Sequence, residues 1–213
     1  MYKFFKITLI VLGVIIFGIA VLVFSFIQSM KPDKDKEEEV KVQAEKYLKD
    51  NFNSNFVIYD TLFDNMGNFG FEYAAKVRDT VTETQFLVYY DDEKNHMVDT
   101  YIAEKWAKDL EKEISLFIEE NLEDSTDLYV FFDDKIGNEF GIDPNNPRNY
   151  KDFDVEPTIR IRVPRKKSDE DEKIINEFVT LLKSEAELQH GSVVMEYIAE
   201  NGVILDDEWW KDF

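Results

Sequence analysis

The chain of 213 residues contains no cysteine, only two histidines, and few residues that break regular structure, namely eight glycines and five prolines. Without cysteine there can be no disulfide, no thiolate metal ligand and no thiol nucleophile. Any folded domain must therefore draw its stability from its core. His96 lies beside an expected hairpin turn and His190 precedes a helix-terminating glycine, both ordinary surface positions. We expect neither to be catalytic or to bind a metal, and we predict no cofactor.

The sequence also lacks a catalytic or nucleotide-binding signature. Ser192 follows His190 by two residues, but GSVVM has no second glycine where a nucleophile elbow needs one. Paired carboxylates such as Asp91 with Asp92 could serve acid–base chemistry in a cleft. With 45 acidic residues, however, such pairs are expected by chance. A non-enzymatic role is therefore the favoured expectation.

Basic residues are in short supply, 25 against 45 acidic ones, so the formal net charge is -20. Only two of the basic residues and none of the acidic ones precede residue 31, which leaves residues 31–213 near -22. Such a surface repels phosphate backbones and anionic headgroups, so it excludes nucleic acid as a partner. It is compatible with a protein or cationic partner. The aromatic share of 15% argues against disorder.

One long apolar run stands out at the amino terminus, in MYKFFKITLIVLGVIIFGIAVLVFSFIQSM. Residues 7–27 carry no charge, and at about 1.5 Å per residue a helix of that length spans the roughly 30 Å hydrocarbon core of a bilayer. A cleavable signal has a shorter core and a small-x-small site, whereas cleavage after Ser29 would place the bulky Ile27 at one of the small positions. The run predicts a retained transmembrane anchor over residues 1–30, in contact with lipid through residues 7–27.

The orientation of this anchor depends on the charges that flank it. Lys3 and Lys6 precede the run, whereas Lys31, Lys34 and Lys36 follow it among acidic residues. A strict count of basic residues slightly favours a cytoplasmic carboxyl-terminal side. The opposite orientation is favoured by the short, purely basic amino terminus, and by the acidic residues that lie among the lysines after the run. We predict a single-pass protein of the cell membrane, with the amino terminus in the cytoplasm and the following domain outside it.

Residues 31–38 (KPDKDKEE) lack apolar periodicity and predict a charged, solvated linker that runs into a helix. A first module is expected over residues 39–104. Its helix is indicated by apolar residues at helical spacing between Val40 and Phe52. Strand-like runs follow in NFVIYDTLF, FGFEYAAKVRDT, TETQFLVYYDD and HMVDTYI, and alternation over residues 71–78 favours an antiparallel meander with one buried face.

A second module is expected over residues 105–213. It begins with an amphipathic helix over residues 106–122 and continues with the strand DLYVFFDD, a long loop over residues 135–156 and the strand PTIRIRV. Ser168 and Asp171 resemble a capping box for a helix that Gly191 closes. The strand SVVMEYIA, a short return at GVIL and a polar tail complete it.

The repeated order of amphipathic helix and apolar strand suggests that the two modules are related. The predicted fold class is α+β, with a transmembrane helix followed by antiparallel sheets packed against amphipathic helices.

Two groups of residues are candidates for binding. The 135–156 loop and its approach could offer oxygen ligands to a hard cation such as Ca²⁺, although their spacing does not fit an EF-hand and a simple polar loop is the favoured interpretation. These candidate ligands are Asp133, Asp134, Asn138, Glu139 and Asp143. Long loops and tryptophans are also typical of partner surfaces. The partner candidates are Asn145, Asn146, Arg148, Tyr150, Trp209 and Trp210, the alternative for the tryptophans being that they pin the terminus to the core.

An anchor such as FKITLIVLGVIIFGIAVLVFSF, a charged linker and a cysteine-free acidic domain resemble the layout of small, uncharacterised, membrane-anchored extracytoplasmic proteins of Gram-positive bacteria. That resemblance implies only a location. From the residues we expect a non-enzymatic module that binds a protein or envelope component through a sheet face or the 135–156 loop. One alternative is a hydrolase of envelope polymer that uses loop carboxylates. Another is an immunity-type protein whose acidic surface neutralises a basic toxin.

Overall fold

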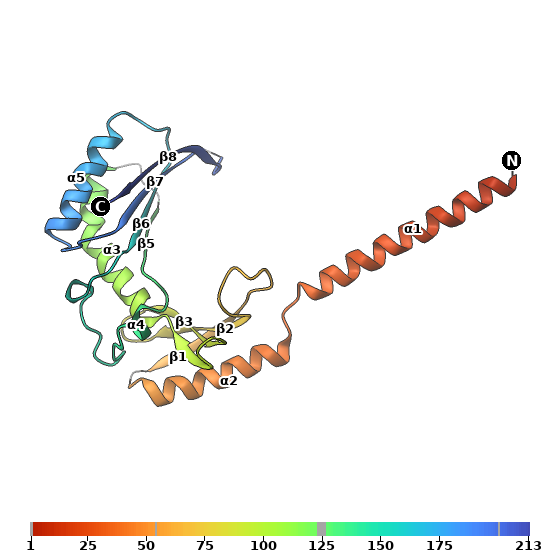
Figure 1. Ribbon diagram of the computed structural model, residues 1–213, viewed down its shortest axis with the longest axis horizontal. Coiled ribbons are helices and arrows are strands. Elements are labelled where there is room, and N and C mark those ends of the chain that lie inside the picture. The colour runs from red at the N-terminus through yellow and green to blue at the C-terminus, as the bar shows by residue number, and fades with distance from the viewer. Residues whose placement is uncertain (1, 54, 123–126, 200) are drawn as a thin grey trace.

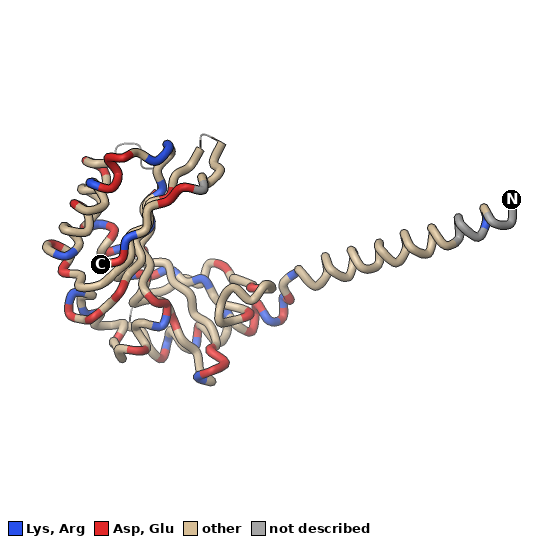
Figure 2. Tube along the Cα trace, turned by 45° about the horizontal axis from the view of Figure 1, so that its top comes forward, with Lys and Arg blue, Asp and Glu red and all other residues tan. Residues whose placement is uncertain are grey.

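The computed structural model describes residues 2–53, 55–122, 127–199 and 201–213, without the side chains of residues 2–4, 7–10 and 206. Its first element, α1 (Tyr2–Ser29), is a single helix of 28 residues. This helix is about 42 Å long and apolar enough to cross a membrane. It projects away from the rest of the chain (Figure 1), and the charged residues gather on the remainder (Figure 2).

The segment between α1 and the folded domain is shorter than expected. Helix α2 (Lys34–Asn51) begins inside the predicted linker, because the side chain of Asp33 accepts a 2.9 Å hydrogen bond from the amide of Asp35 and caps the helix. Residues 34–38, which were expected to precede the helix, are thus its first residues, and most of them are exposed to solvent. Lys36 pairs with Glu72 at 2.9 Å, which fastens this part of α2 to the sheet beside it.

Sheet A is an antiparallel meander in the order β1-β2-β3-β4, as the alternating sequence predicts. Its strands are β1 (Phe56–Phe63), β2 (Tyr73–Asp79), β3 (Gln85–Asp91) and β4 (His96–Asp99). Helix α2 buries Val40, Ala44 and Leu48, and the last two belong to the core that covers one face of this sheet. The 135–156 loop that follows later in the chain is partly helical, with α4 (Ile136–Glu139) and the 3-10 turn η1 (Tyr150–Asp152).

Sheet B has the order β5-β6-β7-β8. Its strands are β5 (Asp127–Phe131), β6 (Thr158–Val163), β7 (Ser192–Ile198) and β8 (Ile204–Asp212). Strands β6 and β7 are parallel, because α5 (Asp171–Ser184) connects them as a crossover; the other pairs are antiparallel as predicted. The predicted short return and polar tail are in fact one strand, β8, so the tail prediction is wrong.

Helix α3 (Tyr101–Asn121) joins the two sheets. Its residues Trp106, Leu110 and Ile114 are fully buried in one continuous core that contains residues of both sheets. The module boundary expected at residue 105 therefore falls inside a helix that both sheets share. Helices α3 and α5 lie on the same side of sheet B (Figure 1), and the α+β class is confirmed.

Candidate binding surfaces

Sheet B has an outer face that none of the described helices covers. Pairing in register places Tyr129, Arg160, Val194 and Trp210 in one row across the four strands. Since successive residues alternate between faces, the intervening residues Ile159, Ile161, Val193 and Met195 point into the core instead. Trp210 is 61% exposed and Phe131 is 48% exposed on this outer face, which is therefore an aromatic surface open to solvent.

The side chains of the outer face are held in place by one another. The guanidinium of Arg162 lies 5.1 Å from the ring centre of Tyr129, and that of Arg160 lies 5.8 Å from the ring centre of Phe131. Both arginines also contact the carboxylate of Glu196, at 3.2 Å from Arg160 Nε and 2.8 Å from Arg162 Nε. Each arginine is thus fixed by a ring and by a charge.

The exposed tryptophan is fixed in a similar way. Its indole Nε1 donates a 2.8 Å hydrogen bond to Asp212 Oδ1, which also accepts a 2.6 Å hydrogen bond from the Ser192 hydroxyl. The bonds from Ser192 and Trp210 lower the pKa of the Asp212 carboxyl. The ring of Trp210 is thereby oriented before any ligand arrives, which reduces the conformational entropy lost on binding.

A second candidate surface is a groove beside the free edge of β5, which we call the edge groove. It is a cavity of about 400 Å³ between α3, the start of β3 and β5. The small side chains of Ala103 and Ala107 face it from α3, and Tyr129 and Phe131 line it from β5. The edge groove therefore adjoins the outer face of sheet B through these two aromatic residues.

Four carboxylates line the edge groove. Glu83 pairs with Arg78 at 3.6 Å, and the other three are Glu104 and Glu111 from α3 and Asp134 from the segment after β5. Glu104 is exposed to solvent, yet desolvation by the surrounding protein, together with Asp134 and Glu111, raises its pKa to about 7. Desolvation also raises the pKa of Glu111, and desolvation with the adjacent Asp133 raises that of Asp134. The groove thus brings together carboxylates whose negative charges are only partly balanced by hydrogen bonds or basic groups.

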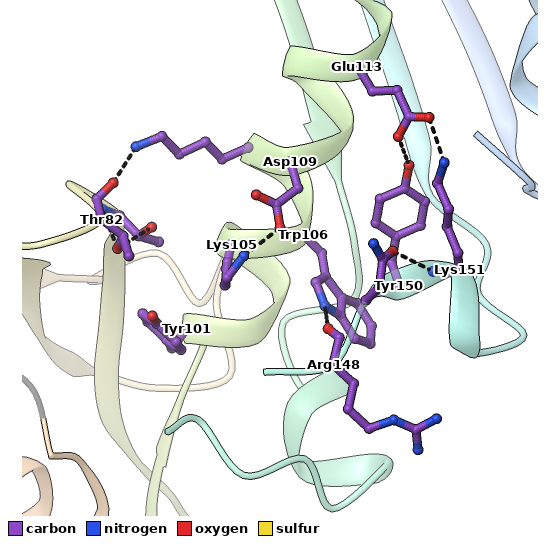
Figure 3. A network of polar contacts seen from close by, with 12 residues as sticks. Thr82, Tyr101, Lys105, Trp106, Asp109, Glu113, Arg148, Tyr150 and Lys151 are labelled. Atoms are coloured by element: carbon purple, nitrogen blue, oxygen red, sulfur yellow. Dashed lines mark hydrogen bonds and ion pairs between the residues drawn. The ribbon is translucent and has the colours of Figure 1, made fainter. Parts of the chain in front are cut away.

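The 135–156 loop packs against α3 through several of its candidate residues (Figure 3). The Tyr150 side chain is buried, and its hydroxyl donates a 2.6 Å hydrogen bond to Glu113, which also accepts one from Lys151. Arg148 is exposed; its main-chain carbonyl accepts a hydrogen bond from Trp106, and its guanidinium lies 4.6 Å from the ring centre of Phe153.

The asparagines of this loop differ in their surroundings. Asn145 accepts a 2.6 Å hydrogen bond from the amide of Asn53 and donates one of 2.7 Å to the carbonyl of Asn51, so it joins the loop to the end of α2. Asn146 is exposed beside it. The structure therefore buries Tyr150, uses the exposed Asn145 to join the loop to the end of α2, and leaves Asn146 and Arg148 at the surface.

The candidate metal ligands lie along the same region without forming a cluster. Asp133 accepts a hydrogen bond from the amide of Lys135, and Asp143 accepts one from that of Asn145, both turn-forming contacts. Asn138 and Glu139 belong to α4 and are exposed. Over the described ranges of the chain, no three His, Asp or Glu side chains are grouped so that they could hold a metal ion.

The two neighbouring tryptophans take opposite faces of β8. Trp209 packs against the core, with Lys167 Nζ 4.2 Å from its ring centre, whereas Trp210 faces solvent. Trp209 therefore pins the terminus to the core, and the partner-surface prediction stays a prediction for Trp210. Sequence reasoning missed Tyr129, Arg160 and Arg162. Their signal was the alternation of arginine and isoleucine in TIRIRV, which shows that the non-core face of this strand carries arginines.

Comparison with known proteins gives little further information. No protein-family model matches the chain, and no curated protein matches it. Among solved structures, the crystal structure of a DUF5037 family protein from Ruminococcus gnavus is similar with a TM-score of 0.42 and 13% sequence identity, over 75% of each chain.

Proposed function

We propose that the protein is a non-enzymatic binding module, anchored in the cell membrane by α1, that binds another protein of the cell envelope through the outer face of sheet B. The observation that carries this proposal is the exposed and pre-oriented Trp210 on the same sheet face as two arginine–aromatic pairs, from which β7 separates it. Tryptophan, tyrosine and arginine are the residues most enriched at binding hot spots. An exposed apolar patch on a sheet face without a helix is typical of an interaction site.

Photocrosslinking in living cells tests the proposal. A benzoylphenylalanine at Glu208, exposed on β8 beside Trp210, is expected to give a discrete protein adduct, whereas one at Val42 on α2 is not. Trp210→Ala should abolish the adduct, while Val203→Ala, which truncates another exposed apolar residue, should leave it. An adduct that persists in Trp210→Ala, or none at all, would overturn the proposal.

The proposed topology has its own test, because the chain contains no cysteine that would interfere with labelling. We propose that the amino terminus is cytoplasmic and the domain extracytoplasmic, on the charge pattern around α1. Val81→Cys, at a position 76% exposed in the domain, should react with a membrane-impermeant maleimide in intact cells. Lys6→Cys should react only after permeabilisation. The reverse pattern would invert the topology.

A second candidate function is hydrolysis of an envelope polymer, favoured by the carboxylates of the edge groove. A carboxylic acid whose pKa is about 7 can act as a general acid at neutral pH, and Glu104 has that property. The hydrolase would release soluble fragments from purified cell-wall polymer. Glu104→Gln should abolish the release, while Glu38→Gln on the exposed side of α2 should not; wild-type protein without activity would dismiss this function.

A further inference from the structure

The edge of β5 that faces the edge groove is open, since β5 is the first strand of sheet B and pairs only with β6 among the described strands. In an antiparallel pair, alternate residues direct their main-chain groups away from the partner strand. Val130 shows this direction, because its amide donates a 3.2 Å hydrogen bond to the Glu111 side chain on α3. The Glu111 carboxylate thus accepts the hydrogen bond that a carbonyl of an added strand could accept from the amide of Val130.

The space beside this edge is elongated. A second cavity, of about 550 Å³, shares Thr84, Lys108 and Glu111 with the edge groove and reaches Leu128. Together the two cavities follow β5 from Leu128 to Phe132, a distance of about 13 Å at 3.3 Å per residue. The groove therefore runs along the strand, as an extended peptide would.

The charge of the groove favours a basic ligand. The edge groove itself is lined by Glu83, Glu104, Glu111 and Asp134 with one basic residue, Lys108. The second cavity adds Lys112 and the ion pair of Lys105 with Asp109, so the acidic end of the space is the edge groove. Lys108 donates a 2.6 Å hydrogen bond from its Nζ to the carbonyl of Thr82 in the β2–β3 turn, and its charge offsets only part of the desolvation that raises the pKa of Glu111. A cationic side chain placed among Glu104, Glu111 and Asp134 would relieve their mutual repulsion.

We propose that the open edge of β5 binds an extended basic peptide, which pairs with β5 as a fifth strand of sheet B and places a lysine or arginine between Glu104 and Asp134. A peptide carbonyl replaces the Glu111 carboxylate at the amide of Val130, and Glu111 is then free to pair with the cation. This is recognition by β-strand addition, in which main-chain hydrogen bonds give affinity and side-chain pockets give specificity. The inference rests on the proposed binding function but uses a different edge of the sheet from Trp210.

Synthetic peptides and the full chain in detergent micelles test this inference. The probe is acetyl-Thr-Val-Lys-Val-Thr-Val-amide, titrated by calorimetry, with hydrogen exchange as a second measurement. Binding should slow exchange in residues 127–132 and weaken with added salt. A peptide with glutamate in place of lysine, and one with N-methylated amides at alternate positions, should each bind at least tenfold more weakly.

Protein variants give the matched control. Glu104→Gln should weaken binding of the lysine peptide several-fold, while Glu38→Gln on α2 should not change the affinity. The N-methylated peptide keeps the test independent of whether a variant folds. Equal affinity for the lysine and glutamate peptides, or protection from exchange outside residues 127–132, would overturn the inference. Trp210→Ala should retain peptide binding, so failure of the crosslinking experiment and failure of this one can be told apart.

Discussion

The indole Nε1 of Trp106 donates a 2.7 Å hydrogen bond to the main-chain carbonyl of Arg148 (Figure 3). Trp106 is fully buried in α3, and its ring lies 5.7 Å from that of Phe132 and 5.3 Å from that of Phe153. The helix that joins the two sheets therefore also holds the 135–156 loop, through a residue that belongs to the core.

The hydrogen bond and the aromatic ring of Trp106 should each contribute to the free energy of unfolding, and two substitutions separate them. Trp106→Phe keeps an aromatic ring but leaves the carbonyl of Arg148 without its donor, so the free energy of unfolding should fall by about 1–3 kcal/mol. Trp106→Ala also removes the ring, and should cost about 3–5 kcal/mol. Denaturant unfolding followed by circular dichroism measures both. Trp210→Phe, at an exposed position, should stay within about 0.5 kcal/mol; an equal loss in Trp106→Phe and Trp210→Phe would contradict the role of the bond.

Periodicity predicted most of the elements because each buries one face. The i, i+4 spacing of Trp106, Leu110 and Ile114 marks α3, and the alternation of Ile159, Ile161 and Val163 marks β6. The start of α2 could not be found in this way, since residues 34–38 are charged throughout and their helix depends on the Asp33 cap and on contacts with sheet A. Likewise α5 ends at Ser184, well before the glycine expected to close it, because Glu187 takes a left-handed conformation (φ 56°) and the amide of Leu188 donates a 3.0 Å hydrogen bond back to the carbonyl of Leu182.

The candidate site was less predictable than the fold. Trp210 was among the predicted partner residues because tryptophan is enriched at binding hot spots. The rest of the outer face could not be predicted with it, because Arg160 and Tyr129 come from β6 and β5, far earlier in the chain. Local sequence does not specify which strands lie side by side, and the parallel pairing of β6 with β7 is what places Arg160 opposite Val194. The edge groove depends on the same long-range arrangement, since α3 brings Glu104 to Asp134.

Asn145 provides a test of whether the 135–156 loop serves structure or binding. Its side chain satisfies the carbonyl of Asn51 and the amide of Asn53 at the end of α2. Asn145→Ala should lower the free energy of unfolding by about 0.5–1.5 kcal/mol, since these groups are partly open to water. Asn146→Ala, at the exposed neighbour, is the control and should be neutral. If both substitutions instead removed a crosslinked partner without affecting stability, the loop would be a binding surface.

Asp171 should be the most sensitive ionised residue of the domain. Its buried carboxylate accepts hydrogen bonds of 3.0 and 2.6 Å from Arg165, 2.7 Å from the Tyr197 hydroxyl and 2.7 Å from the amide of Ser168. Asp171→Asn removes the buried charge that pairs with Arg165, and should cost about 3–5 kcal/mol in chemical denaturation. Asp169→Asn, at an exposed position in the same loop, should have no measurable effect.

The stability that the Asp171 carboxylate contributes should depend on pH. Desolvation opposes ionisation of Asp171, but the bonds from Arg165, Tyr197 and Ser168 outweigh it, so its pKa in the folded protein lies below the ordinary value of 3.8. A group whose pKa is lowered by folding contributes stability above the unfolded pKa, and this contribution is lost as the pH falls through the folded one. The loss caused by Asp171→Asn should therefore be full at pH 6 and shrink below pH 4. An effect that is constant from pH 7 to pH 3 would show that Asp171 is not ionised in the folded state.

The ionisation of Glu104 should make the free energy of unfolding depend on pH in the opposite direction. Its pKa is raised by folding from 4.5 to about 7, so the folded protein binds more protons than the unfolded chain between these values. Stability should then fall as the pH rises from about 4.5 to 7, with the full penalty present above pH 7. Glu104→Gln removes the charge, and should raise the free energy of unfolding at pH 8 but not at pH 4. Because Glu104 is exposed, solvent screening should keep the gain to about 1 kcal/mol or less. Urea unfolding at the two pH values measures it, with Glu38→Gln as the control. A gain of equal size at pH 4 would mean that ionisation of Glu104 is not its cause.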